Sequence, residues 1–327
     1  MEAKHQQPKT LQAAIQHFSD PQVCIDAVAA LRWPDGKPTC PACEKQDHYY
    51  LKTQRRWKCK ECGRQFSVKL GTIFEDSAIG LDKWLVTLWM LVNCKNGISS
   101  YEIHRAVGVT QKSAWFMLHR LRLTLQEPKL GTKLGSNEGG EVEIDETFVG
   151  GKKRNMHKER SIRYEQKGGA QGKAVVMGIL DRDLRKVRAK VVPNVKRDTL
   201  QAEVLSNVKY GSKVYTDDAV AYDKLQWRYV HEVVNKTETY VRGRVHVNGM
   251  ENFWSLLKRG LNGTYVAVEP FHLFRYVDEQ IFRFNNRKDE MGNKMGDAER
   301  FQIALSQVAG KRLTFKEVTG KVGETAF

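Results

Sequence analysis

The chain has 327 residues, a length that suits two or three domains, and its excess of Lys and Arg gives a formal net charge of +16. Its longest apolar run, residues 85–92, is too short to span a bilayer, which excludes a membrane-spanning protein. Residues 1–16 lack the apolar centre of a signal peptide, so we expect an intracellular protein. The charge favours a polyanionic partner, with nucleic acid ahead of acidic lipids and ribosomes.

Residues 1–35 are expected to form an N-terminal helical segment. Within it, apolar residues recur at helical intervals over residues 20–31, which predicts one short helix. Cys24 lies in this helix without a partner cysteine at the spacing of a metal site. We therefore interpret Cys24, and Cys94 further along the chain, as small buried residues.

Two Cys-x-x-Cys pairs define the next segment, residues 36–70. The pairs Cys40/Cys43 and Cys59/Cys62 are separated by 15 residues that include strand-forming aromatic side chains. Four thiolates on two hairpins suit one structural Zn²⁺, and this spacing is typical of a zinc ribbon. A redox pair and an iron–sulfur cluster are alternatives that the symmetric spacing disfavours. Because so small a segment has little core, we expect the metal to stabilise its folded state.

Residues 71–125 carry the pattern of a helix-turn-helix region. A helix is predicted over residues 81–93, and two shorter helices follow, at residues 99–106 and from Thr110 onward, separated by a Val-Gly-Val turn. In a helix-turn-helix motif the second helix enters the major groove of DNA. The residues of this helix expected to contact DNA are Gln111, Lys112, Ser113 and, on its outer arc, Arg120. The alternative is a plain helical hairpin.

A glycine-rich linker is expected at residues 126–140, and a second domain at residues 141–290. The order of elements in this domain is three strands, helix, strand, helical turn, strand, helix, which predicts an α/β fold. Its strands are expected at residues 141–149, 173–181, 185–192, 213–216 and 229–234, and its helices at 197–208 and within 246–260. Residues 291–327 are left as a C-terminal tail.

A basic segment follows the first strand of this domain. Between residues 148 and 173 there are eight Lys or Arg residues and two Glu residues, a net charge of +6. A segment of this kind is usually mobile alone and becomes ordered on a phosphate backbone. Lys152, Lys153 and Arg154 are therefore candidate DNA contacts.

Three acidic residues are expected to converge in the second domain. Asp145 lies on the first predicted strand, Asp217 follows the fourth, and Glu251 lies in the first turn of the last helix. Reactive groups of α/β sheets gather at the carboxyl ends of strands. Three carboxylates are hard oxygen ligands that suit Mg²⁺ or Mn²⁺ and, on a basic protein, two-metal phosphoryl transfer. For Glu251 alone, stabilisation by the helix dipole is the alternative.

These motifs resemble a known protein family. The two cysteine pairs and the two short helices are followed by Ile-Asp-Glu-Thr-Phe-Val-Gly-Gly-Lys at residues 144–152, Tyr-Thr-Asp at 215–217 and Glu-Asn-Phe-Trp-Ser-Leu-Leu-Lys-Arg-Gly at 251–260. Over residues 33–287 the chain resembles a bacterial insertion-sequence transposase of the ISXO-type branch of the DDE superfamily, which carries an N-terminal zinc ribbon.

The resemblance implies a fold, a site and partners. The fold would be α/β, with a ribonuclease H-like mixed-sheet catalytic domain preceded by a small zinc ribbon and a helix-turn-helix domain. Asp145, Asp217 and Glu251 would be the catalytic triad and would bind two Mg²⁺ or Mn²⁺ ions. Lys258, with Arg259 beside it, would contact the end of the element. The partners would be double-stranded DNA and further copies of the chain, in a homodimer or higher oligomer, in the bacterial cytoplasm at the nucleoid.

We therefore hypothesise a DNA transposase that cuts the ends of an insertion sequence and transfers them to target DNA. The alternatives are a structure-selective nuclease, a non-mobile DNA-binding regulator descended from a transposase, and an RNA-binding protein of the translation machinery. Neither of the last two needs three carboxylates in one place. Asp218 and Glu146 are interpreted as supporting or surface acids, and His246 as a hydrogen-bonded structural residue.

Overall fold

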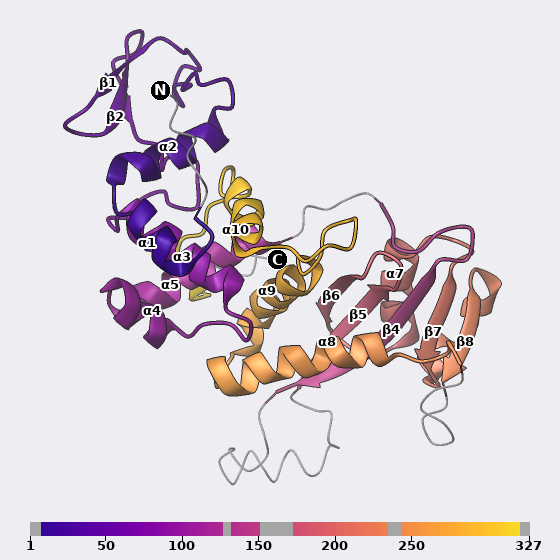
Figure 1. Cartoon of the computed structure of the whole chain (residues 1–327). Helices are drawn as coiled ribbons and strands as arrows, with labels where there is room; N and C mark the ends of the chain where they lie inside the picture. The colour runs from indigo at the N-terminus through magenta and orange to yellow at the C-terminus, as the bar shows by residue number, and fades with distance from the viewer. Residues whose placement is uncertain (1–7, 127–131, 151–172, 235–242, 321–327) are drawn as a thin grey trace. The chain divides into compact units, whose positions relative to one another are not determined.

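The computed structural model describes residues 8–126, 132–150, 173–234 and 243–320 (Figure 1). The chain forms two compact units, one of residues 1–126 with 294–327 and the other of residues 127–293. Among the residues that the structure describes, no helix combines the length and the apolar character needed to cross a lipid bilayer.

The first unit begins with two helices and a small antiparallel sheet. Its elements are α1 (Leu11–His17), α2 (Pro21–Arg32), β1 (His48–Leu51), β2 (Arg56–Cys59) and β3 (Gln65–Phe66), with the sheet order β1-β2-β3. The side chain of Asp20 caps α2 by accepting a hydrogen bond from the Gln22 N–H. Trp57 of β2 packs edge-on against Trp33 at the end of α2, with ring centroids 5.1 Å apart. This contact joins the sheet to the helices.

Helix α3 (Leu81–Asn93) forms much of the core of the first unit, since eight of its 13 residues are buried. Two shorter helices, α4 (Ser100–Val107) and α5 (Gln111–Arg122), follow it and pack on each other. Gly108 ends α4 in a left-handed conformation (φ 63°), and the side chain of Thr110 caps α5. The turn between the two helices is therefore three residues long, as the sequence predicts.

The C-terminal residues return to the first unit. Helix α10 (Asp297–Ser306) packs along α3, where Phe301 contacts Trp89 with ring centroids 5.2 Å apart. After α10 the backbone pairs with the loop before α3, and a short helix, α11 (Phe315–Val318), follows. The expected tail at residues 291–327 is therefore corrected over Asp297–Ser306, because the apolar face of α10 is buried against α3.

The second unit is built on a five-stranded mixed sheet. Its strands are β4 (Glu141–Val149), β5 (Ala174–Asp181), β6 (Lys186–Val192), β7 (Lys213–Asp217) and β8 (Val230–Val234). Their order is β6-β5-β4-β7-β8; β4, β5 and β6 are antiparallel, and β4, β7 and β8 are parallel. The mixed α/β fold is confirmed, and the predicted strand ends agree with these bounds to about one residue.

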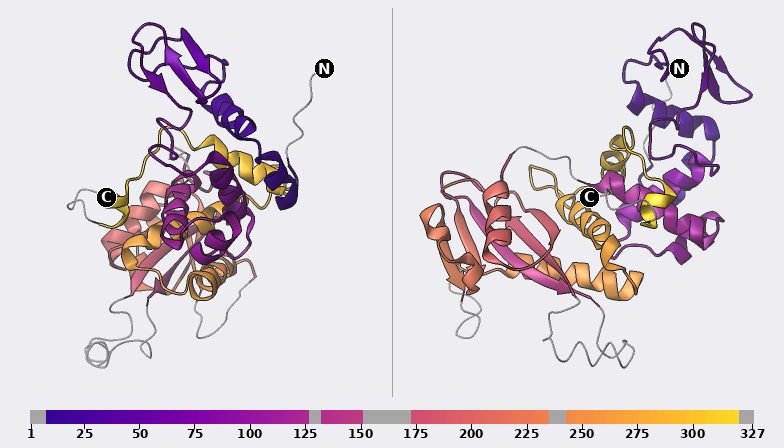
Figure 2. Two further views of the ribbon diagram at one scale, coloured as in Figure 1. Left: turned by 90° about the vertical axis from the view of Figure 1, so that its left-hand side faces the viewer. Right: turned by 180° about the vertical axis from the view of Figure 1, so that it is seen from behind.

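Helices cover both faces of this sheet (Figure 1, Figure 2). Val142 and Ile144 of β4 share a core with α7 (Arg197–Asn207), whereas Val176 and Leu180 of β5 share one with α8 (Asn248–Arg259) and α9 (Leu273–Asn285). Since side chains alternate along a strand, Glu143 and Asp145 of β4 point to the α8 face. Short helical turns lie at Leu123–Leu125, Val220–Tyr222, Leu225–Trp227, Gly260–Tyr265 and Pro270–His272.

Candidate functional site

Two of the predicted catalytic acids belong to neighbouring parallel strands. β4 and β7 pair with Glu143 opposite Tyr215. This is the last pair of the ladder, and Asp145 and Asp217 each lie two residues beyond it, with Asp217 at the carboxyl end of β7. Residues two apart on a strand point to the same face, so both carboxylates lie on the face that α8 covers. Asp145 is 7% exposed, and Asp217 is half-buried.

The third acid, Glu251, lies one turn of α8 before Trp254, the residue of this helix that contacts Asp145. The indole Nε1 of Trp254 donates a hydrogen bond to Oδ2 of Asp145 at a distance of 2.9 Å. Glu251 precedes Trp254 by three residues and therefore lies on the same side of the helix. The first turn of α8, with its half-buried Glu251, is thus held against the strand that carries Asp145.

A glycine on β5 makes room for this contact. Gly178 pairs with Asp145 across the ladder between β4 and β5. A Cβ atom at Gly178 would lie 2.2 Å from Cε of Met250 and 2.8 Å from the ring of Trp254. A side chain at this position would therefore push α8 away from the sheet. The signal in the sequence is a glycine inside an otherwise apolar strand, which marks a close approach.

Glu143, which the sequence analysis did not single out, joins β4 to α8. It is 1% exposed, and its Oε1 accepts a hydrogen bond from Nε of Arg182 at 2.7 Å. Its Oε2 accepts one from the backbone N–H of Met250 at 2.9 Å. Val247 precedes α8 without supplying a side-chain cap, so Glu143 pairs an N–H that the first turn leaves unsatisfied. An acid at a buried strand position is the signal that points to such a partner.

Glu141, at the start of β4, holds the segment that leads to α8. Nε and Nη2 of Arg244 each donate to Glu141 at 2.8 Å, and Nη1 of Arg182 donates at 3.1 Å. These hydrogen bonds, chiefly those from Arg244, lower the pKa of Glu141 from 4.5 to about 2. His246 accepts a hydrogen bond from Nη2 of Arg182 at Nδ1, 2.9 Å away, in keeping with a structural role.

The cysteines group more tightly than the three acids. Among the described residues, one group of three or more possible metal ligands lies close together. It consists of Cys40, Cys43, Cys59 and Cys62, whose sulfur atoms all lie within 4.8 Å of one another. Asp145, Asp217 and Glu251 do not form such a group. In a two-metal site the ions are about 3.5–4 Å apart, and each lies about 2.1 Å from its ligands. Carboxylate oxygens up to roughly 8 Å apart can therefore bind the same pair of ions, so such a site does not require the close spacing of the cysteine sulfurs.

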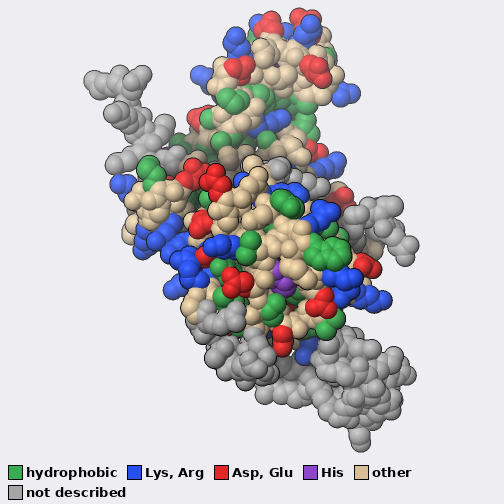
Figure 3. All heavy atoms as spheres, turned by 90° about the vertical axis from the view of Figure 1, so that its right-hand side faces the viewer, with side chains coloured by type: hydrophobic (Ala, Val, Ile, Leu, Met, Phe, Trp, Pro, Cys, Tyr) green, Lys and Arg blue, Asp and Glu red, His purple; other side chains and the backbone are tan. Residues whose placement is uncertain are grey.

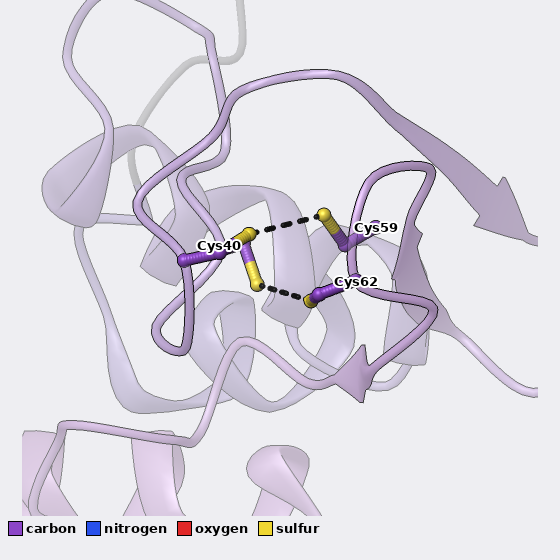
Figure 4. A group of neighbouring side chains, drawn as sticks. Cys40, Cys59 and Cys62 are labelled. Atoms are coloured by element: carbon purple, nitrogen blue, oxygen red, sulfur yellow. Dashed lines mark hydrogen bonds between the residues drawn. The ribbon is translucent and has the colours of Figure 1, made fainter.

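The geometry of the four cysteines fits a tetrahedral metal site. Sγ of Cys40 lies 3.6 Å from Sγ of Cys62, and Sγ of Cys43 lies 3.5 Å from Sγ of Cys59. Figure 4 shows the sulfur atoms of Cys40, Cys59 and Cys62 turned toward one another from two loops. Zn–S bonds of about 2.3 Å in a tetrahedron separate the sulfurs by about 3.8 Å. The four thiols are therefore arranged as a zinc ribbon requires.

The candidate DNA contacts of α5 lie in different settings. Lys112 is exposed, whereas Gln111 donates a hydrogen bond to the hydroxyl of Ser100 at 2.9 Å. Arg120 is 3% exposed; it donates to the backbone carbonyl of Glu75 at 2.7 Å and lies over an aromatic ring of α3. The expectation that Arg120 faces DNA is therefore corrected, because its arc of α5 is packed inside the unit. The aliphatic stem and planar head of arginine suit such a site.

The other basic candidates belong to the second unit. Lys258 and Arg259 are exposed in the last turn of α8. Lys152, Lys153 and Arg154 lie outside the described residues. Figure 3, which views the molecule from the β8 side, shows Lys and Arg side chains interspersed with acidic ones on that face.

Known proteins match both parts of the chain. Residues 138–285 match the family model of the ISXO2-like transposase domain, and residues 19–65 match that of the transposase zinc-ribbon domain. An uncharacterized protein in transposable element ISH50 of Halobacterium salinarum is 26% identical over 260 residues, which cover 76% of this chain and 85% of that protein. An uncharacterized transposase-like protein of Haemophilus influenzae is 35% identical over 102 residues, 31% of this chain and 82% of that protein.

A solved structure is also similar. A chain in the cryoEM structure of a simian T-cell lymphotropic virus intasome complex shows 14% sequence identity and a TM-score of 0.30. The similarity covers 63% of this chain and 70% of that chain.

Proposed function

We propose, from the premise that this chain belongs to the family of transposases with an ISXO2-like domain and a zinc ribbon, that it cuts and joins DNA at Asp145, Asp217 and Glu251. The observation that carries the proposal is the parallel pairing of β4 and β7, because Asp145 and Asp217 each follow the paired residues Glu143 and Tyr215 by two positions. We further propose that the second unit is ribonuclease H-like, and its mixed strand order with helices on both faces supports this assignment.

The three carboxylates fit divalent cations that prefer oxygen ligands, Mg²⁺ or Mn²⁺. Two such ions would supply an activated oxygen nucleophile and neutralise charge on the scissile phosphate. The residues of the chain hold the ligands in place. Trp254 orients Asp145, the rigid first turn of α8 carries Glu251, and Asp217 accepts a hydrogen bond from the Ala219 N–H at 3.3 Å. Fixed ligands lower the cost of reorganisation during the reaction.

Basic residues around this site would bind the DNA backbone. Lys258 follows Glu251 by seven residues, about two helical turns, so both lie on one side of α8. Arg259 is adjacent and also exposed. The segment with Lys152, Lys153 and Arg154 follows directly on the strand that carries Asp145. Positive charge next to a carboxylate site suits a polyanionic substrate, since it offsets repulsion between phosphates and acids.

The first unit would recognise DNA. We propose that α4 and α5 form a helix-turn-helix motif in which Gln111, Lys112 and Ser113 meet the major groove; the three-residue turn and the exposed Lys112 support this role. The four cysteines would hold one structural Zn²⁺. Because a transposase acts on two element ends, we propose a homodimer or a larger assembly.

A cleavage assay on duplexes from the ends of the element tests the proposal. We expect Asp145→Asn, Asp217→Asn and Glu251→Gln each to slow Mg²⁺-dependent strand cleavage by at least about 1,000-fold while end-binding affinity changes by less than about threefold. Asp218→Asn is the matched control, because this acid directly follows Asp217 on the chain. Cleavage by the Asp145→Asn variant at the wild-type rate would exclude this mechanism.

A second assay separates cutting from joining. Pre-cut ends with a free 3′-hydroxyl are mixed with target plasmid, and the joined product is measured. A transposase forms joined molecules with the wild-type chain and none with Asp145→Asn. Cleavage without joining would instead indicate a nuclease, and end binding without cleavage would indicate a DNA-binding regulator.

A further inference from the structure

We propose that Glu143 is a positioning residue: its carboxylate clamps the first turn of α8 to β4 and so sets the position of Glu251 relative to Asp145. This role rests on the function proposed above for the acids of that site. Glu143 lies two residues before Asp145 on the same strand and on the same face of the sheet. It is therefore close to the site without belonging to the triad.

The hydrogen bonds of Glu143 suit a clamp rather than a metal ligand. Nε of Arg182 donates to Oε1 at 2.7 Å, and the Met250 N–H donates to Oε2 at 2.9 Å. The carboxylate is 1% exposed, so it meets donors of this chain instead of solvent or substrate. A carboxylate at the N-terminus of a helix also interacts favourably with the helix dipole. Both oxygens thus have partners that a divalent cation would have to displace.

Arg182 fixes the orientation of this carboxylate. Its guanidinium has five N–H donors, and five acceptors surround them. Nε donates to Glu143, Nη1 to Glu141 and to the carbonyl of Arg244, and Nη2 to the carbonyl and to Nδ1 of His246. The same group lies over the ring of Tyr215 on β7, 4.3 Å from its centroid. The clamp therefore connects β4, β7 and the segment that leads into α8.

Two contacts pin α8 to β4, one on each side of Glu251. The Met250 N–H binds Glu143, and the indole of Trp254 binds Asp145. The two helix positions are four residues apart, a rise of about 6 Å, and the two strand positions are two residues apart, about 6.6 Å. Since these two distances are nearly equal, both hydrogen bonds form together in one alignment of α8 along β4. Gly249 permits the approach, because a Cβ atom there would lie 2.9 Å from Oε2 of Glu143.

The matched variants are Glu143→Gln and Glu141→Gln. In Glu143→Gln an amide with one acceptor oxygen replaces a carboxylate with two. Its NH₂ group would face either Arg182 or the Met250 N–H, both of which are donors, so one of the two hydrogen bonds would be lost. Glu141 lies on the same strand, and its carboxylate binds Arg182 and Arg244, which both lie outside α8. The pair therefore separates the clamp from a general loss of charge on β4.

The experiment is a calorimetric titration of the zinc-loaded full-length protein with Mn²⁺. We expect Mn²⁺ binding that Asp145→Asn abolishes, that Glu143→Gln weakens by at least about tenfold, and that Glu141→Gln changes by less than about threefold. In the cleavage assay, Glu143→Gln should raise the Mn²⁺ concentration for half-maximal rate and recover at saturating Mn²⁺. A purely structural defect would lower the amount of active protein without moving that concentration.

If the Glu143→Gln protein folds and binds Mn²⁺ as tightly as the wild type, the proposed role of Glu143 is wrong, and the proposed metal-binding triad is unaffected. Wild-type protein without Asp145-dependent Mn²⁺ binding overturns the proposed function and the clamp with it. If Glu143→Gln does not fold, Arg182→Lys replaces it. A lysine keeps the charge but not the five-donor geometry, so we expect it to weaken Mn²⁺ binding by about threefold or more. Unchanged binding in Arg182→Lys counts against the clamp.

Discussion

The indole N–H of Trp254 donates a hydrogen bond to the carboxylate of Asp145 across the contact between α8 and β4, with 2.9 Å between Nε1 and Oδ2. Both residues are buried, at 4% and 7% exposure. A hydrogen bond to an ionised acceptor is strong in such a place, because little water competes with it. The bond fixes the direction of the carboxylate and the position of α8 together.

Removal of this hydrogen bond is therefore expected to impair the reaction more than the fold. We expect Trp254→Phe to slow strand cleavage by about tenfold to a hundredfold, since a hydrogen bond to a charged group contributes about 1.5–3 kcal/mol. Cleavage rate and thermal unfolding by circular dichroism are the measurements. Trp227→Phe is the control, because Trp227 is 74% exposed. A folded Trp254→Phe protein that cleaves as fast as the wild type would show that Asp145 needs no such support.

The close approach of α8 to β5 predicts intolerance at Gly178. We expect Gly178→Ala to lower the free energy of unfolding of the second unit by about 1–3 kcal/mol, because the added methyl group overlaps Met250 and Trp254. Urea unfolding measures the change. Gly263→Ala is the matched control, because a Cβ atom there has no neighbour within 4 Å. Equal stability of the two variants would mean that Met250 and Trp254 do not pack closely against Gly178.

The ion pair of Glu141 predicts a dependence on acid. The pKa of Glu141 is lowered from 4.5 to about 2, so the pair stabilises the fold fully above pH 4.5 and its contribution disappears as the pH falls through about 2. We expect Glu141→Gln to cost about 1–2 kcal/mol of unfolding free energy at pH 6, a value reduced for the solvent exposure of Arg244. Near pH 2 the two proteins should be equally stable.

Urea unfolding of both proteins at the two pH values measures this difference. Loss of zinc in acid affects wild type and variant alike and cancels in the comparison. A difference that stays constant from pH 6 to pH 2 would mean that the ion pair with Arg244 is not its source.

The cysteine quartet predicts that zinc stabilises the ribbon. We expect the purified protein to contain one Zn²⁺ and a strong chelator to unfold β1 to β3 while the second unit keeps its stability, because metal binding supplies the folding free energy of such small modules. Elemental analysis and the fluorescence of Trp33 and Trp57 follow the change. Cys94→Ala should keep the zinc, and Cys59→Ala should lose it. Zinc retained in Cys59→Ala would contradict the assignment.

Local pattern in the sequence was sufficient for the strands of the second unit and for α2 to α5 of the first, but it missed α1, α10 and α11. Alternation along residues 141–149 predicted β4 with its bounds, and the cysteine spacing predicted the ribbon. These features are short-range: which residues are apolar, and at what period, depends on neighbours within one element. Asp145 was a site candidate on the same information, since an acid within an alternating strand is conspicuous in the sequence itself.

The partners of these residues depended on contacts between distant parts of the chain. Glu143 meets Arg182 39 residues later and Met250 107 residues later, and no periodicity within one element encodes such pairs. The spacing of the apolar residues of α5 assigned Arg120 to the outer arc of the helix, but the loop before α3 and α3 itself bury it. Helix α10 likewise has a place only once α3 offers a face to cover. Pattern thus sets which surfaces must be buried, and packing of the whole chain selects what buries them.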